Sequence, residues 1–384
     1  FLEKSVIYFY LWDQFFKNNK VKGVIVSQAV YNSTIPIRIG LKYKCTCLAS
    51  SPNRVTKLSK QIPYAHNENL TYKKLFSKLD NSQKKLALKK TEEMLKQSFE
   101  KNSKISKKEL FLSSNSYRKK SFVSKNKFAK IWSKKRSIKK SKRLKILICP
   151  HALSDAPHTR GTHLFPDFYE WLVSVLEISN KTKYDWYIKL HPDLNQYWDK
   201  TEIIIKDLLK KKYKKVKYLN NKTPHTKIID EGINFAITCA GSVCAEYAYF
   251  KIPTVNSSLS NPHTDFSFSV NPKSILEFER LLLNLKKFKK KFSKKELLIY
   301  FFMSEYYYSD NWLLQNWKDI LEFCSDRTGL YRDIFYHYWI NNFDKSLHER
   351  SIKGLEKFIV SNDHRLNFRH LGDNLNDHLK RFEY

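Results

Sequence analysis

The polar residues best placed for chemistry follow short apolar runs in the middle of the chain. The densest group comes after the run KILIC, where His151, Asp155, His158, Arg160 and His163 fall within thirteen residues. A general base needs a pKa near the working pH and must reach the hydroxyl that it deprotonates, and His or Asp can meet both needs. We therefore expect Asp155 or His151 to be the catalytic base, with His158, Arg160 and His163 as possible further site residues.

Two other interpretations of this loop are open from the residues alone. Polar side chains of these types are also typical of turns and caps, which would give them a structural role only. The histidines could bind a metal, but their spacing is irregular and contains no helical i, i+4 pair. We therefore predict no metal site.

A second group follows the apolar run DWYIKL. Pro192 ends the expected strand and holds His191 at its end, and Lys189 lies two residues before His191. An imidazole at a strand end can donate a hydrogen bond to a phosphate oxygen, and a nearby ammonium adds positive charge. We therefore predict that His191 and Lys189 bind the phosphate of a substrate.

A third group, TCAGSVCAE at 238–246, joins an apolar run to a helix. Gly241 permits a tight turn, and Ser242 then falls at the helix amino terminus, where free N–H groups and the helix dipole attract phosphate. Glu246 lies one helical turn later on the same side, and a carboxylate is a good acceptor for ribose hydroxyls. The structural alternative is a capping Ser followed by an exposed Glu. The chain lacks GxGxxG and GxxxxGK[ST], which argues against a dinucleotide enzyme and a P-loop NTPase.

These three groups need elements that bring them together. From Leu144 onward, apolar strand-like runs alternate with amphipathic helical segments as far as IPTVNSS at 252–258. Such alternation predicts a parallel sheet covered by helices on both faces, with right-handed crossovers. Ligands bind outside the carboxyl ends of the strands in such sheets, and the three polar groups fall there.

The order of these motifs resembles the carboxyl-terminal half of GT-B glycosyltransferases, over about residues 144–285. The shared features are an HP pair after a strand, a Gly-Ser turn with Glu four residues on, and then x-x-Pro-hydrophobic. In style the chain is similar to capsule-polysaccharide synthesis proteins and to the CDP-glycerol glycerophosphotransferases of teichoic-acid synthesis. The resemblance implies that His191 and Ser242 hold the donor phosphates and that Glu246 contacts the donor ribose or sugar.

The resemblance also implies an activity. We expect a glycosyltransferase that moves a sugar from a nucleotide-activated donor to a growing surface polysaccharide or a lipid-linked acceptor, without a cofactor or an obligatory metal. A glycerophosphotransferase or a sugar-nucleotide epimerase of the same architecture is the alternative among enzymes. The teichoic-acid enzymes typically show His-Gly near the start of this half, whereas here Ala152 follows His151.

The whole chain divides by texture into four regions. Residues 1–65 are expected to be a partial amino-terminal α/β domain on the acceptor side, and 66–143 a helical and basic linker. Residues 144–285 are expected to be the donor nucleotide-binding α/β domain, and 286–384 a helical carboxyl-terminal region. This organisation predicts a GT-B-like α/β fold whose second half contains a Rossmann-like, doubly wound parallel sheet.

The net charge of +34 invites phosphate-bearing substrates, anionic membranes or nucleic acid as partners. Residues 101–143 hold seventeen Lys or Arg against one acid, Glu109, so this block is expected to be a solvated arm or connector. It could lie on an anionic membrane surface or bind a nucleic-acid backbone, although Lys is abundant throughout the chain. A basic nucleic-acid-binding protein is the main alternative to an enzyme, but the chain lacks an RNP, KH or zinc-finger signature. A non-catalytic scaffold at the membrane surface is the third alternative.

Cysteine use points to a reducing compartment, and hydropathy bears on whether the chain crosses a membrane. Cys45-x-Cys47 is too tight for an ordinary zinc knuckle, and we expect the six cysteines to be free thiols. No run approaches the ~20 apolar residues of a spanning helix. We expect a cytoplasmic protein, with peripheral attachment to the inner face of the cell membrane as an option. The start, FLEKSVIYFYLW, lacks an initiator Met and a signal-peptide layout, so we expect missing upstream sequence or processing.

Overall fold

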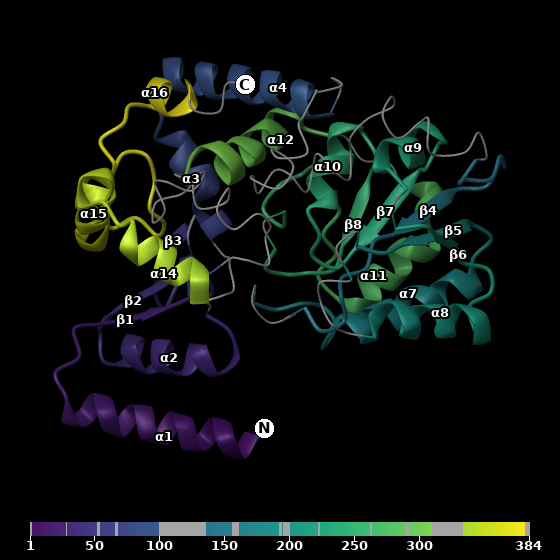
Figure 1. Ribbon diagram of the computed structural model, residues 1–384. Helices are drawn as coiled ribbons and strands as arrows, with labels where there is room; N and C mark the ends of the chain where they lie inside the picture. Colours follow the sequence, from purple (N-terminus) through teal and green to yellow (C-terminus); the bar gives the residue numbers. More distant parts are fainter. Residues whose placement is uncertain are drawn as a thin grey trace. The chain divides into compact units, whose positions relative to one another are not determined.

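The computed structural model describes residues 2–27, 29–51, 54–65, 68–99, 136–155, 161–191, 194, 200–221, 223–261, 263–288, 292–308 and 333–380. These residues form two compact units (Figure 1). Unit 1 contains the described residues up to Lys90 together with those from Phe302 onward. Unit 2 contains the described residues from Thr91 to Phe301.

Unit 2 is built on a five-stranded sheet in which every neighbouring pair is parallel, with the order β6-β5-β4-β7-β8. The strands are β4 (Lys145–Ile148), β5 (Asp185–Lys189), β6 (Lys217–Leu219), β7 (Phe235–Thr238) and β8 (Thr254–Asn256). The chain therefore winds outward from β4 in one direction and from β7 in the other. This strand order confirms the predicted doubly wound parallel sheet.

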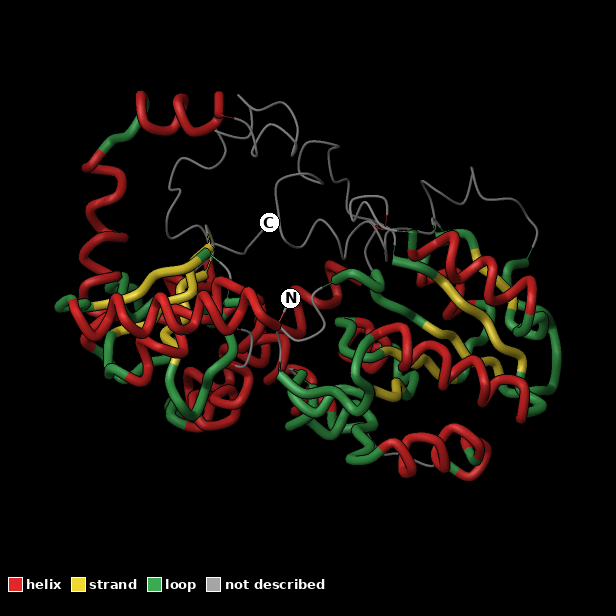
Figure 2. The backbone as a smooth tube through the Cα atoms, turned by 90° about the horizontal axis from the view of Figure 1, so that it is seen from below, coloured by secondary structure: helices red, strands yellow, loops and turns green. Residues whose placement is uncertain are grey.

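The helices of unit 2 cover both faces of this sheet (Figure 2). They are α7 (Phe168–Lys181), α8 (Thr201–Lys211), α9 (His225–Asp230), α10 (Val243–Tyr249), α11 (Ile275–Leu283) and α12 (Lys294–Phe301). Right-handed crossovers that progress in opposite directions place their helices on opposite faces. Accordingly α7 contacts α11, and α10 contacts α12.

The local sequence accounts for these elements. The side chain of Asp167 caps α7 by accepting from the Glu170 N–H, and the helix buries Trp171, Leu172 and Val175 on one side. The strands read as apolar runs because both of their faces are covered, and Ile146 and Ile148 have no exposed surface. The core of unit 2 therefore lies between the sheet and its helices, and it fixes the ends of the strands.

Unit 1 contains a three-stranded sheet, β1-β2-β3, in which β1 and β2 are parallel and β3 is antiparallel to β2. Its amino-terminal elements are α1 (Leu2–Asn18), β1 (Gly23–Val26), α2 (Thr34–Lys42), β2 (Thr46–Ser51), β3 (Arg54–Leu58) and α3 (Tyr72–Ser77). The division between the units falls within α4 (Asn81–Phe99). Residues 1–65 thus contain both helices and strands, which fits the α/β character expected for them.

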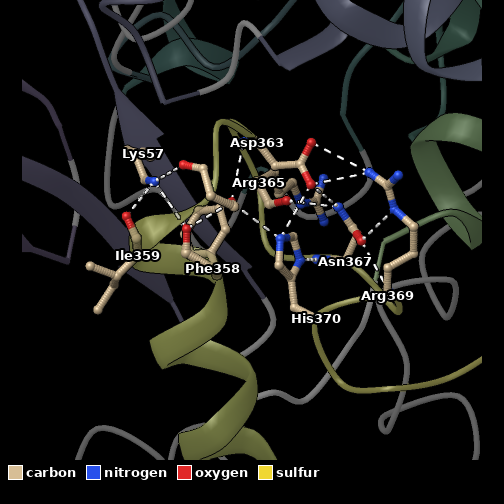
Figure 3. Close-up of polar contacts among 9 residues, drawn as sticks. Lys57, Phe358, Ile359, Asp363, Arg365, Asn367, Arg369 and His370 are labelled. Carbon is tan, nitrogen blue, oxygen red and sulfur yellow. Dashed lines mark hydrogen bonds and ion pairs between the residues drawn. The ribbon is translucent and has the colours of Figure 1, made fainter.

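The carboxyl-terminal residues of unit 1 are helical and return to β3. They include α14 (Asp333–Asn341), α15 (Lys345–Val360) and α16 (Leu375–Lys380). The Lys57 N–H donates to the His364 carbonyl at 2.7 Å, and the Leu366 N–H donates to the Val55 carbonyl at 3.0 Å. Lys57 also donates from Nζ to carbonyls at the end of α15 (Figure 3). The carboxyl-terminal segment thereby extends the sheet of unit 1.

The structure describes the basic block and the cysteines only in part. Most of the basic block 101–143 lies outside the described residues, as does Cys324. The five described cysteines are free, as expected. Among the helices in the described ranges, none combines the length and the apolarity needed to cross a bilayer.

Candidate functional site

The candidate site lies at the carboxyl edge of the sheet in unit 2. The register pairs Ile148 at the end of β4 with Ile188 of β5 and with Ile237 of β7. Because the three strands are parallel and adjacent, the residues that follow them lie at one edge. The structure thus brings together the segments containing His151, His191 and Ser242, as the sequence predicted.

His151 is fixed by the segment that follows β7. Its Nε2 accepts a hydrogen bond from the Ala240 N–H at 3.1 Å, and its ring stacks on Phe168 with 4.5 Å between ring centroids. A neutral imidazole that accepts at Nε2 carries its proton on Nδ1, an assignment that rests on the hydrogen bond. In this geometry His151 holds the turn before Ser242 in place, and its Nε2 lone pair is occupied.

The turn at Gly241 is tight for a specific reason. The Gly241 N–H donates to Thr238 Oγ1 at 3.2 Å, and a Cβ at position 241 would lie 2.8 Å from that oxygen. Ser242 follows as the residue that precedes α10, and its side chain is exposed at the edge. A side chain at position 241 would therefore require either the Thr238 side chain or the turn to shift.

Ser242 and Glu246 contact each other, as their one-turn spacing predicted. The Ser242 hydroxyl donates to Glu246 Oε1 at 3.0 Å, and Ser242 makes no side-chain cap to α10. Glu246 is only 4% exposed, so the alternative of a capping Ser and an exposed first-turn Glu is wrong. A buried carboxylate needs compensating partners, and this places Glu246 among the residues that shape the site.

Lys189 supplies a buried positive charge to the same region. It ends β5 and is 3% exposed. Burial raises the pKa of the neighbouring Cys149 thiol to about 12, with Lys189 opposing that shift and Glu246 reinforcing it. Lys189 and Glu246 therefore both act on Cys149, and the floor of the site contains one buried cation and one buried carboxylate.

Two further residues were missed by the sequence analysis. His225, at the start of α9, shares a 2.8 Å hydrogen bond between its Nδ1 and the Tyr247 hydroxyl. Burial, with Lys189 and His191 adding to it, holds the pKa of His225 well below its usual value. Burial also raises the pKa of Tyr247 well above its usual range. Both side chains are therefore neutral near pH 7, and His225 follows β6 just as His191 follows β5.

The loop after β4 is described only in part. The Asp155 N–H donates to the Ala152 carbonyl at 3.1 Å, which closes a turn, and the Asp155 side chain is half-buried. The backbone of His163 forms an antiparallel β-bridge with Ser258. The centroid of its ring lies 5.8 Å from that of Phe168, the ring on which His151 stacks. Phe168 thus brings His151 and His163 to one place. His158 and Arg160 lie outside the described residues.

The loop that follows β8 is held by an internal polar network. Asn261 donates to Asn256 Oδ1, and the His263 N–H donates to Asn261 Oδ1 at 2.8 Å. Ser258 and His263 are buried, at about one per cent exposure each. This network gives the loop a defined shape beside the segment containing His163. Among the described residues, no three His, Cys, Asp or Glu side chains are grouped to hold a metal ion.

Comparisons with known proteins give structural similarities only. No family model and no curated protein matches the chain. Among solved structures, a KpsC from Thermosulfurimonas dismutans, a beta Kdo 2,4 transferase, is similar with a TM-score of 0.41 and 12% identity, over 72% of this chain and 78% of that chain. The UDP-GlcNAc 2-epimerase of Methanocaldococcus jannaschii, in complex with UDP-GlcNAc and UDP, has a TM-score of 0.33 and 12% identity, over 77% of this chain and 79% of that chain.

A second structure of that epimerase has a TM-score of 0.31 and 13% identity, over 77% of this chain and 80% of that chain. The similar structures thus include a transferase and an epimerase. Because the identities and TM-scores are low, the functional proposal rests on the site itself.

Proposed function

We propose that this chain is a glycosyltransferase of GT-B type, which moves a sugar from a nucleotide-activated donor to a growing surface polysaccharide or a lipid-linked acceptor. The observation that carries the proposal is the convergence of His191, Ser242 and Glu246 at the carboxyl edge of the sheet, above buried Lys189. An open parallel sheet binds nucleotides at this edge. Residues 144–285 are the proposed donor domain.

The donor phosphates are proposed to lie against His191 and the Gly241–Ser242 turn. The ammonium of Lys189, held beneath the edge, adds positive potential in a region of low dielectric, where it is felt more strongly than in water. Glu246, which accepts from the Ser242 hydroxyl, is proposed to accept a hydrogen bond from a donor hydroxyl as well.

Transfer breaks the bond between the anomeric carbon of the sugar and the leaving phosphate, and it forms a bond to the acceptor oxygen. The acceptor proton goes to a base, and we assign that role to Asp155, because the Nε2 atom of His151 already accepts from Ala240. His151 is then a positioning residue for the Gly241–Ser242 turn. Charge on the leaving phosphate is stabilised by His191, Lys189 and the turn, without a cofactor or an obligatory metal.

The partners and location follow from the same proposal. The donor is a nucleotide sugar and the acceptor a saccharide or a lipid-linked saccharide. Residues 101–143 are proposed to lie along an anionic membrane surface, which would make the chain a peripheral protein of the inner face of the cell membrane, in the cytoplasm. We propose no role for nucleic acid.

Thermal unfolding with CMP, CDP, UDP, GDP and dTDP tests the donor site. We expect one nucleotide to stabilise the chain by ~2.7 kcal/mol at 100 times its dissociation constant. His191→Ala and Ser242→Ala should each reduce that shift. The matched controls are His337→Ala and Ser77→Ala, two exposed side chains in unit 1 that should leave it unchanged.

Turnover separates transfer from epimerisation. A transferase releases nucleotide from its donor only in proportion to an added acceptor, whereas an epimerase interconverts sugar nucleotides without one. Full turnover in the double variant His191→Ala, Ser242→Ala would contradict the proposed site. If a DNA oligomer stabilised the chain against thermal unfolding and none of the nucleotides did, the chain would be a nucleic-acid-binding protein and the enzyme proposal would be wrong.

A further inference from the structure

Unit 2 carries a basic surface at the amino edge of its sheet, opposite the candidate site. The register pairs Lys145 at the start of β4 with Asp185 of β5, and Lys217 at the start of β6 with Tyr187 of β5. Neighbouring strands lie about 4.8 Å apart, so the segments that precede β4, β5 and β6 lie side by side. These segments are residues 136–143, 181–183 and 210–217.

All three segments are rich in exposed lysine. They read RSIKKSKR, KTK and KKKYKKVK, and each of their Lys and Arg side chains is exposed. We call these Lys and Arg side chains the amino-edge patch. Within it, Lys183, Lys214 and Lys217 form no ion pair with any residue that the structure describes.

Acids compensate only part of this charge. Lys211 pairs with Asp207 and Lys212 pairs with Glu177, while two other acids hold the segment 136–143. Glu231 accepts from the backbone N–H groups of Ser137 and Ile138 at 2.8 and 2.7 Å, and Asp185 accepts from the Ser141 hydroxyl. These contacts fix residues 136–143 against the sheet. Arg136 also donates to the carbonyls of Ile138 and Glu231, and the other basic side chains of the segment are exposed. The patch therefore keeps a large uncompensated positive charge.

The distribution of lysine in unit 2 is uneven, and this asymmetry argues for a function. In the sequence, the segments that follow β4, β5, β6 and β7 contain four histidines but only three Lys or Arg residues. The segments are 149–167, 190–200, 220–224 and 239–242, and the three residues are Arg160, Lys200 and Lys222. Lysine used as a general surface residue would appear at both edges of one sheet. Its concentration at the amino edge indicates a partner there.

We propose that the amino-edge patch docks the protein on anionic lipid headgroups. The patch contains only two arginines, Arg136 and Arg143, whereas recognition of nucleic acid favours the planar, bidentate guanidinium. The one aromatic residue of the three segments, Tyr213, is buried, so they offer no ring on which bases could stack. Lysines spread along a sheet edge suit a broad anionic surface, to which each basic residue adds attraction.

This docking sets the direction in which the candidate site faces. The strands of the sheet run from the patch to the site, so a membrane at the amino edge leaves His191 and Ser242 facing the aqueous phase. Nucleotide-activated donors are soluble, and they would reach the site without passing the membrane. The proposal holds whether or not the chain transfers sugars, because it depends only on the patch.

Co-sedimentation of the full chain with vesicles tests the proposal. We expect binding to vesicles of phosphatidylglycerol and phosphatidylcholine, weakened by added salt, and no binding to phosphatidylcholine alone. Replacing Lys142, Lys183, Lys214 and Lys217 by Gln should reduce the partition coefficient about tenfold or more. The matched control replaces four exposed lysines outside the patch, Lys78, Lys89, Lys345 and Lys357, by Gln and should bind as the wild type does.

The outcomes are distinct. Equal loss in both quadruple variants would show that net charge, and not the patch, drives binding, and this would overturn the proposal. Unchanged binding by the patch variant would place the lipid contact elsewhere in the chain and would also overturn it. If the patch variant loses binding to an RNA oligomer while the wild type ignores anionic vesicles, the partner is a nucleic acid and the lipid proposal is wrong.

Discussion

The buried side chains of the candidate site differ in charge. Lys189 is the buried cation, and the His225–Tyr247 pair beside it is neutral because burial disfavours the charged form of both rings. A second cation at His225 would repel Lys189. The neutral pair therefore packs next to the Lys189 ammonium without adding charge. The positive potential at the edge comes from Lys189 and His191.

The neutrality of His225 predicts a pH dependence of stability. Its pKa is lowered in the folded chain, so below its usual pKa of 6.5 the unfolded chain binds more protons than the folded one. The stabilisation is present above that value and is lost as the pH falls, by up to about 1.4 kcal/mol per pH unit. We expect His225→Gln, which cannot titrate, to flatten the change in unfolding free energy between about pH 7.5 and pH 5, measured with urea.

Two points make this measurement decisive. Burial also lowers the pKa of His364, which contributes its own slope, so the comparison is the difference between variant and wild type. His337→Gln, at an exposed position of α14, should keep the wild-type slope. An identical slope in His225→Gln would mean that His225 takes up its proton equally in the folded and the unfolded chain, and the lowered pKa of His225 would be wrong.

The search for polar residues at the carboxyl ends of the expected strands identified some residues of the candidate site and missed others, for a physical reason. His151, Lys189, His191, Ser242 and Glu246 were predicted because they follow apolar runs or stand one helical turn apart. His225 follows the short strand β6 but also begins a helix, and the helical pattern hid it. Tyr247 looked like an ordinary apolar position of α10, and only packing against His225 gives it a polar partner.

At the scale of elements, the parallel sheet was predictable and β3 was not. Strands of a covered parallel sheet read as apolar runs, which the sequence displays plainly. The segment RVTKL at 54–58 has a mixed pattern, and it becomes a strand by pairing with β2 on one side and bridging to Arg365 on the other. That bridge spans most of the chain in sequence, so no local pattern could predict it.

Lys57 of β3 is expected to hold the end of α15 in place. Its Nζ donates to the carbonyls of Phe358, Ile359 and Ser361 at 2.9, 2.7 and 2.6 Å (Figure 3). The last carbonyls of a helix lack the usual i+4 N–H partners, and a cation there is also favoured by the helix dipole. The Phe358 carbonyl additionally accepts from the N–H and the hydroxyl of Ser361. We expect Lys57→Met to lower the free energy of unfolding by about 1–3 kcal/mol, measured by urea denaturation.

The control for this variant lies three residues away. Lys60→Met removes an exposed ammonium with no described hydrogen bond or ion pair and should change stability by less than about 0.5 kcal/mol. Equal effects of the two substitutions would mean that the loss of one positive charge, and not the contact with α15, determines the result. If Lys57→Met left the free energy of unfolding unchanged, water would be replacing the ammonium at these carbonyls at no cost, and the predicted role of Lys57 would be wrong.

At the scale of the whole molecule, the sheet of unit 2 separates two surfaces of different character. The carboxyl edge combines polar and buried charged side chains around the Gly241 turn, whereas the amino edge carries exposed lysine. The first was predicted from the sequence, because strand ends can be read locally, whereas of the second only the segment 136–143 was recognised, as part of the basic block 101–143. The second requires the strand order, which places segments 136–143, 181–183 and 210–217 beside one another.

This separation predicts that nucleotide and lipid bind without competing. Hydrogen exchange of the full chain should slow with the preferred nucleotide in peptides covering 149–155 and 239–246, and with anionic vesicles in peptides covering 136–143 and 210–217. Each ligand should leave the other set unchanged, and vesicles should shift the nucleotide affinity less than about twofold, because the edges lie at opposite ends of the strands. Protection of 239–246 by vesicles, or displacement of nucleotide by them, would place both ligands at one surface and would contradict the assignment of the two edges.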